Sequence, residues 1–261
     1  MVAERASGPL RVRTVGRVVV ATMDAPPMNP VSREMVAAWE ETIAAVAADD
    51  GVRALVVTGA GQHFCVGADI KQFRDIGVVE SDDGYFRRRS AMVSTIEASP
   101  KPVIAAVRGN CLGGGFEIAL ACHLRLADRS ARFGLPEIRL GVMPSWGGTQ
   151  RLGRLVRRDV ALRMLLTADP VPATEALEVG IITELHEADE LDAAALAWAE
   201  RLAAQPRRAV AAILDSVVRG GDLPLAEGLE VEIANALICR SSPDAREGSR
   251  AFLEKRPPNF E

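Results

Sequence analysis

Lysine is scarce in this chain of 261 residues, because only Lys71, Lys101 and Lys255 are lysines among its 31 basic residues. The formal net charge is −4, aromatic residues make up 4% of the chain, and the densest basic run is Arg87-Arg88-Arg89. Nucleic-acid-binding proteins need a positive field opposite the phosphates and aromatic side chains for base stacking. We therefore exclude general nucleic-acid binding.

Long apolar runs are also missing. No stretch reaches the roughly 18 apolar residues of a membrane-spanning helix, and charged residues interrupt the first 23 residues, so the sequence predicts neither a membrane span nor a signal peptide. The 4 cysteines form no Cys-x-x-Cys pair, and neither they nor the scattered histidines show the spacing of a zinc site. We expect a cytoplasmic protein with reduced thiols and no metal.

Short apolar strands alternate with helical segments in the first part of the chain. Residues 11–23 predict a strand or a hairpin that turns at Gly16, while residues 53–58 and 102–107 are apolar on both faces, as in buried parallel strands. A helix is predicted after the N-cap Ser32, and another over 84–98. This alternation favours an α/β fold with right-handed crossovers.

After about residue 188 the pattern is helical throughout. Apolar residues recur on one helical face near 191–202 and near 225–237, and Pro224 and Ser242 are good helix starts. We therefore divide the chain into an α/β core of residues 1–200 and a helical C-terminal region of residues 201–261. The apolar stripes of this region can pack on the core or on a neighbouring subunit.

Three glycine-rich segments could carry chemistry: residues 64–71 (FCVGADIK), 109–117 (GNCLGGGFE) and 133–148 (FGLPEIRLGVMPSWGG). The second leads from a predicted strand into a helix. A helix that starts in glycines presents free N–H groups and the positive end of its dipole, which suits an anion or a developing oxyanion.

Two carboxylates accompany these segments. Glu117 is either a first-turn glutamate favoured by the helix dipole or a catalytic group, and Glu137 is either an ordinary helix-start or loop carboxylate or its partner. A pair of carboxylates beside an oxyanion site is what the general acid/base addition of water requires. Cys111 has no histidine base in its motif, so we do not expect it to be a nucleophile.

In this order and spacing, the three segments resemble the motifs of the crotonase (enoyl-CoA hydratase/isomerase) superfamily. The ending EGSRAFLEKRPPNF resembles the usual end of that family. The resemblance implies a spiral of ββα units with a helical C-terminal region that mediates trimers, often paired into hexamers. It also implies an acyl-CoA thioester substrate and no separate cofactor, because coenzyme A is part of the substrate.

The resemblance assigns roles residue by residue. The N–H groups of Ala68 and Gly114 would form the oxyanion hole for the thioester carbonyl, and Glu117 and Glu137 would bracket the catalytic water. The remaining substrate or CoA contacts that it implies are Asp69, Ile70, Lys71, Trp146 and Lys255. Of these, Lys255 would reach the CoA from a neighbouring subunit, and Trp146 would either shape the acyl pocket or simply pack. We predict that residues 72–90 form a mobile wall of this pocket.

Because both glutamates are present, the favoured activity is the addition of water across the 2,3-double bond of a 2-enoyl-CoA, a hydro-lyase reaction that gives a 3-hydroxyacyl-CoA. An enoyl-CoA isomerase, another crotonase-type lyase or hydrolase with the same oxyanion hole, or a non-catalytic relative is the alternative. A dinucleotide-binding module fits less well, since Phe64 replaces the third glycine after Gly59 and Gly61. A serine hydrolase fits poorly, since Ser145 lacks the first glycine of the nucleophile elbow. The acyl chain and the pathway stay open.

Overall fold

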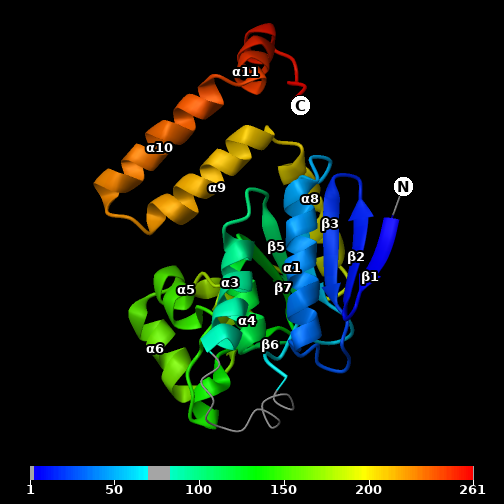
Figure 1. Cartoon of the computed structure of the whole chain (residues 1–261), viewed down its shortest axis with the longest axis vertical. Helices are drawn as coiled ribbons and strands as arrows, with labels where there is room; N and C mark the ends of the chain where they lie inside the picture. Colours follow the sequence, from blue (N-terminus) through cyan, green and yellow to red (C-terminus); the bar gives the residue numbers. More distant parts are fainter. Residues whose placement is uncertain (1–2, 70–82, 261) are drawn as a thin grey trace.

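Two sheets organise the computed structural model, which describes residues 3–69 and 83–260 (Figure 1). In the described residues the larger sheet has seven strands in the order β1-β2-β3-β4-β5-β7-β10, and the smaller has three in the order β6-β8-β9. The strands β1 to β3 pair antiparallel, and from β3 to β10 all neighbours in the larger sheet are parallel. Their bounds are β1 (Ala3–Ser7), β2 (Leu10–Val15), β3 (Val18–Met23), β4 (Ala54–Gly59), β5 (Val103–Val107), β6 (Asn110–Leu112), β7 (Leu124–Asp128), β8 (Arg132–Gly134), β9 (Val171–Pro172) and β10 (Glu184–His186).

Helices cover both faces of the larger sheet and continue beyond it. Their bounds are α1 (Arg33–Ala48), α3 (Asp83–Glu97), α4 (Gly114–Ala121), the 3-10 helix η1 (Pro136–Leu140), α5 (Gly148–Leu155), α6 (Arg158–Thr167), α7 (Ala173–Glu178), α8 (Leu191–Ala203), α9 (Arg207–Gly221), α10 (Leu225–Arg240) and α11 (Pro243–Glu254). Within the described residues, no helix is both long and apolar enough to cross a membrane.

The central strands β3, β4 and β5 of the larger sheet are buried on both faces, and their side chains divide between two cores. In β4, for example, Leu55 and Val57 belong to the core that includes α1, α3 and α4, whereas Ala54 and Val56 belong to the core that includes α8. Successive strand residues point to opposite faces, so a strand covered by helices on both sides must be apolar throughout. This confirms the interpretation of the apolar runs at 53–58 and 102–107.

Other local predictions are confirmed as well. The hairpin of β2 and β3 turns at Gly16, whose φ is 57°, and the Ser32 side chain accepts a hydrogen bond from the Met35 N–H as the N-cap of α1. The Ser242 side chain caps α11 in the same way. The strand β1 was not predicted.

The chain repeats one unit around the site. It leaves β5, adds β6 to the smaller sheet and enters α4; it then leaves β7, adds β8 and enters η1 and α5. This alternation between two sheets followed by a helix is the spiral of ββα units that the resemblance implies, and the α/β prediction is confirmed. The repeat brings the starts of several helices to one end of the sheets.

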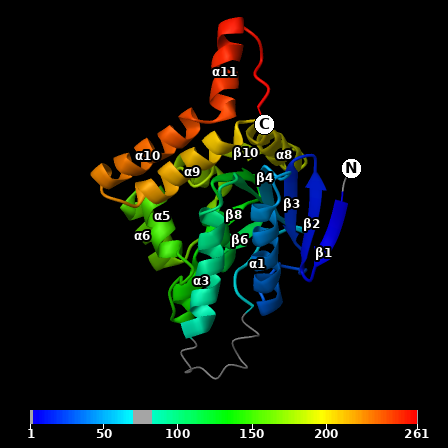
Figure 2. The same cartoon turned by 45° about the horizontal axis from the view of Figure 1, so that its top comes forward.

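The helical C-terminal part begins with α8, which packs on the larger sheet and crosses the predicted boundary at residues 200 and 201. Beyond it, α9 and α10 pack against each other. Figures 1 and 2 show α9, α10 and α11 projecting past the edge of the sheet as an arm. A cavity of about 880 Å³ lies between α9 and the body of the protein, and residues of α3, α5 and the C-terminal end of α4 line it.

Candidate active site

Two of the glycine-rich segments run side by side. The backbones of Cys65 and Cys111 pair in an isolated parallel β-bridge. If this register continues along both segments, Ala68 lies opposite Gly114. The approach is close, because a Cβ atom added to Gly67 would lie 3.0 Å from the backbone nitrogen of Gly114. The structure therefore brings together the two segments that the sequence assigns to one site.

The backbone N–H groups of Ala68 and Gly114 face this junction. The carbonyl oxygen of Gly67 accepts a hydrogen bond of 2.8 Å from Val31 on the other side of the segment. Because the C=O and N–H of a trans peptide point in opposite directions, the N–H of Ala68 points away from Val31. Gly114 is the first residue of α4, where an N–H has no acceptor in the preceding turn. Two donors thus meet at the start of one helix.

The start of α4 depends on glycine for two separate reasons. Gly113 has a φ of 52°, in the left-handed region that other residues adopt at a cost. Gly114 has no room for a side chain, since a Cβ atom there would overlap the indole ring of Trp146. Trp146 is therefore pressed directly against the backbone that carries one of the two donors.

Glu117 lies one turn into α4 and is almost completely buried, with 2% of its surface exposed. Its Oε1 atom accepts hydrogen bonds from the N–H of Trp146 at 2.7 Å and of Gly148 at 2.8 Å. Burial raises the pKa of Glu117 to about 7, although the two N–H donors and Arg151 lower it. The carboxylate is therefore fixed in place and able to exchange a proton near neutral pH.

Glu137 lies in η1 and faces the beginning of α4. A Cβ atom on Gly113 would lie 3.1 Å from its Oε1, and its buried Oε2 has no hydrogen-bond partner among the described residues. Burial raises its pKa too, and its charge contributes to the raised pKa of Glu117. The two predicted glutamates are therefore neighbours, next to the N–H of Gly114.

Arg151, which we did not predict, braces this site from α5. Its guanidinium donates to the carbonyl oxygen of Trp146 at 2.8 Å, to the Glu97 carboxylate at 2.7 Å and to the Ser94 hydroxyl at 3.2 Å. It thus ties α3 to the loop whose N–H groups hold Glu117. An arginine just after a Gly-Gly helix start was the available signal, but its partners in α3, Ser94 and Glu97, are more than 50 residues away in the sequence.

Arg125, also unpredicted, closes the opposite end of α4. This buried side chain donates to the carbonyl oxygens of Ala119 and Cys122 and, at 2.7 Å, to that of Ile181. The last carbonyls of a helix need such donors, and a cation there is favoured by the helix dipole. The helix that positions Glu117 is therefore capped within the core.

The other predicted residues fall in several places. Asp69 follows Ala68 and donates its N–H to the carbonyl of Val31. Ile70 and Lys71 lie outside the described residues, as does most of the segment 72–90 that we predicted to be a pocket wall. Lys255 is the C-cap residue of α11, which Figure 1 places far from α4 of the same chain. Burial raises the pKa of Cys111 well above its usual value, so this thiol stays protonated.

Comparisons with known proteins agree with this geometry. The family model described as enoyl-CoA hydratase/isomerase matches residues 13–261. A probable enoyl-CoA hydratase of Bacillus subtilis is 36% identical over 93% of this chain and 95% of that protein. A crotonyl-CoA hydratase of Syntrophomonas wolfei is 35% identical over 89% of this chain and 90% of that protein. A crystal structure of an enoyl-CoA hydratase from Geobacillus kaustophilus superposes with a TM-score of 0.95 and 29% identity, covering 100% of this chain and 99% of that one.

The fold is therefore the crotonase fold. The chain belongs to the enoyl-CoA hydratase/isomerase family.

Proposed function

We propose that this chain is an enoyl-CoA hydratase and adds water across the 2,3-double bond of a 2-enoyl-CoA. One observation supports this proposal above the others: Glu117 and Glu137 lie together beside the N–H groups of Ala68 and Gly114. Hydration of an enoyl thioester needs this combination, namely donors for the developing oxyanion and two carboxyl groups for the two proton transfers.

In the proposed reaction, the thioester oxygen accepts hydrogen bonds from Ala68 and Gly114. These donors draw electrons from the conjugated double bond and leave C3 electrophilic. The water oxygen bonds to C3 while one ionised glutamate takes its proton, and the other glutamate, protonated, delivers a proton to C2. The product carries the hydroxyl on C3 and the new hydrogen on C2.

The raised pKa values of the two glutamates suit these opposite roles. Both are raised by burial, and the charge of Glu137 adds to the effect on Glu117. Adjacent carboxyl groups resist ionising together, so we infer that the pair holds one proton over a range of pH. One acid and one base are then present at the same time, as water addition requires.

We also propose a homotrimer, or two trimers paired as a hexamer, with the arm formed by α9, α10 and α11 in the interface. This arm exposes many large apolar side chains, more than a monomer usually leaves in water. They are Ile213, Val217, Leu225, Leu229, Ile233, Leu237, Ile238, Phe252 and Leu253. In such an assembly Lys255 would approach a neighbouring subunit, in keeping with its predicted CoA contact.

The test is to mix the purified protein with crotonyl-CoA and follow the loss of enoyl absorbance, with the product identified by mass spectrometry. We expect 3-hydroxybutyryl-CoA, and we expect Glu117→Gln and Glu137→Gln each to lower kcat by about 10²- to 10⁴-fold. Thermal melting of both variants shows whether they are folded. Isomerisation of a 3-enoyl-CoA without any hydration of crotonyl-CoA would contradict the proposal.

A further inference from the structure

Arg151 contacts the loop that holds Glu117 but takes no part in the steps proposed above. Its side chain is only 12% exposed, and it turns back from the first turn of α5 to the carbonyl oxygen of Trp146, just before that helix begins. The positive end of the helix dipole lies there, so a cation is disfavoured. Its Nε is also buried without a hydrogen-bond partner among the described residues. Both features are unfavourable, so this placement calls for a functional explanation.

The Trp146 carbonyl lies in the middle of the loop that binds Glu117. The Oε1 atom of Glu117 accepts hydrogen bonds from the N–H groups of Trp146 and Gly148. These N–H groups belong to the peptides on either side of the one that links Trp146 to Gly147. Arg151 binds the oxygen of that middle peptide at 2.8 Å. Because a peptide unit is rigid, fixing its oxygen limits the rotation of its neighbours. Arg151 therefore acts on the Glu117 carboxylate through the backbone.

Gly147 makes this contact possible. Its φ is 105°, in the region that favours glycine. A Cβ atom at this position would overlap the guanidinium of Arg151. The missing side chain thus allows both the turn of the loop and the approach of the cation.

The other side of the guanidinium is bound by α3. Its Nη2 atom donates to the Glu97 carboxylate at 2.7 Å and to the Ser94 hydroxyl at 3.2 Å. Both α3 and α5 pack on α4, the helix that carries Glu117 (Figure 1). Arg151 thus joins two helices around a third, and Glu97 neutralises part of the positive charge that acts on Glu117.

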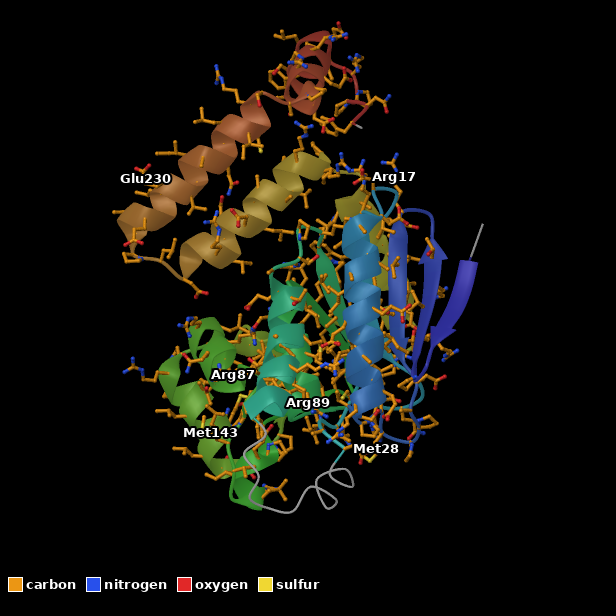
Figure 3. The ribbon with its side chains drawn as sticks, in the orientation of Figure 1. Arg17, Met28, Arg87, Arg89, Met143 and Glu230 are labelled. Atoms are coloured by element: carbon orange, nitrogen blue, oxygen red, sulfur yellow. The ribbon has the colours of Figure 1, made fainter. Side chains whose placement is uncertain are left out.

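The charges around Glu117 come from three elements besides α4. Glu137 of η1 raises the pKa of Glu117, and Arg151 of α5 lowers it. From α3, Arg89 lies across the Trp146 ring, where Figure 3 labels it, and Glu97 pairs with Arg151. A change at either end of the pair of Arg151 and Glu97 therefore alters the charge felt by Glu117 and leaves the proposed reacting groups in place.

We propose that Arg151 is a positioning residue of the hydratase site, which fixes the Trp146 loop and, together with Glu97, sets the charge that Glu117 experiences. A guanidinium suits this role, because its rigid fork of donors can bind a backbone carbonyl and a carboxylate at the same time. This inference rests on the hydratase function proposed above and deepens it by naming a group outside the reacting atoms that controls proton exchange by Glu117.

The ion pair allows two substitutions with opposite electrostatic effects, both assayed with crotonyl-CoA. In Arg151→Met we expect kcat to fall by about 10- to 100-fold while KM stays within about threefold. The pH profile of kcat should move to higher pH, because a carboxyl group without a nearby cation holds its proton more strongly. Glu97→Gln keeps an acceptor for Arg151 but leaves its charge unneutralised. Its pH profile should move to lower pH, with a smaller change in kcat at the optimum.

Two further variants complete the test. Arg151→Lys keeps the charge without the fork and should lower kcat with little change in the pH profile; with Glu97→Gln it decides the question if thermal melting shows that Arg151→Met is unfolded. Arg154→Met, at an exposed position of the same helix, should leave kcat and its pH profile unchanged.

The outcomes separate this inference from the proposed function. An unchanged pH profile in Glu97→Gln or in folded Arg151→Met, or a loss in Arg151→Met that lies only in KM, would overturn the role of Arg151 and leave hydration standing. A wild-type protein that does not hydrate crotonyl-CoA would instead overturn the proposed function.

Discussion

The region around α4 and the arm formed by α9, α10 and α11 are built in opposite ways. In the described structure all residues of α4 are buried, and its two ends are held by the Trp146 loop and by Arg125. In α10 the one buried residue among those described is Val231, and the apolar side chains of that helix lie open. The comparison shows that packing within one chain holds the region around α4 in place, whereas the arm exposes large apolar side chains among the described residues.

The largest effect is expected from a substitution at Gly114, where α4 and Trp146 are packed most closely. In Gly114→Ala the new methyl group overlaps the Trp146 ring, so the ring or the start of α4 must move. We expect kcat/KM to fall by about 10²- to 10³-fold, because a displaced N–H no longer supports the oxyanion. We also expect a loss of about 1–3 kcal/mol in the free energy of unfolding, measured by urea denaturation.

Gly153→Ala is the matched control for this substitution. Gly153 lies inside α5, and a Cβ atom there would meet no other atom within 4 Å. Alanine is favoured over glycine in a helix, so this variant should gain about 0.5–1 kcal/mol with unchanged activity. If Gly114→Ala behaved like Gly153→Ala, the close contact between Trp146 and α4 would not matter for function.

The next effect follows from the buried carboxyl group of Glu117. Its folded-state pKa of about 7 lies above the ordinary 4.5, so burial favours the protonated form. In the unfolded chain Glu117 has its ordinary pKa of 4.5. The contribution of its ionisation to the stability of the folded protein is therefore most favourable below pH 4.5 and is lost as the pH rises through 7. Glu117→Gln cannot ionise and keeps a carbonyl oxygen for the N–H groups of Trp146 and Gly148. We expect its relative stability to improve by up to about 3 kcal/mol between pH 4.5 and pH 8, measured by urea denaturation.

A glutamate-to-glutamine substitution at an exposed position of the arm is the control for Glu117→Gln. Glu230 is an exposed residue of α10, labelled in Figure 3, and Glu230→Gln should change stability by no more than about 0.5 kcal/mol at either pH. A pH dependence of equal size in both variants would show that the burial of Glu117 is not its cause.

The features that the sequence predicted are those in which the interacting residues lie close together along the chain. The hairpin at Gly16 and the cap at Ser32 depend on neighbouring residues, so local patterns were enough. The glycine motif that includes Gly114 was visible for the same reason. The Arg151 brace and the contact of Arg89 with Trp146 join segments more than 50 residues apart. No periodicity or turn signal encodes such contacts, because they exist only once the sheets and helices have packed.

The smallest effect on the fold is expected in the arm. Leu229, Ile233 and Leu237 follow one another at intervals of four residues along α10 and are exposed in the single chain, so a charge among them disturbs little internal packing. We expect Leu237→Asp to change the free energy of unfolding by no more than about 0.5 kcal/mol at protein concentrations too low for assembly.

At higher concentrations the result should differ, because an aspartate in an apolar interface is desolvated without a partner. Sedimentation velocity should then show the proposed trimer for the wild-type protein and a smaller species for Leu237→Asp. Val231 is a buried residue of α10. In contrast to Leu237→Asp, the substitution Val231→Asp should therefore destabilise the arm itself. If Leu237→Asp kept the mass of the wild type, α10 would not lie in the subunit interface, and its apolar stripe would need a different partner.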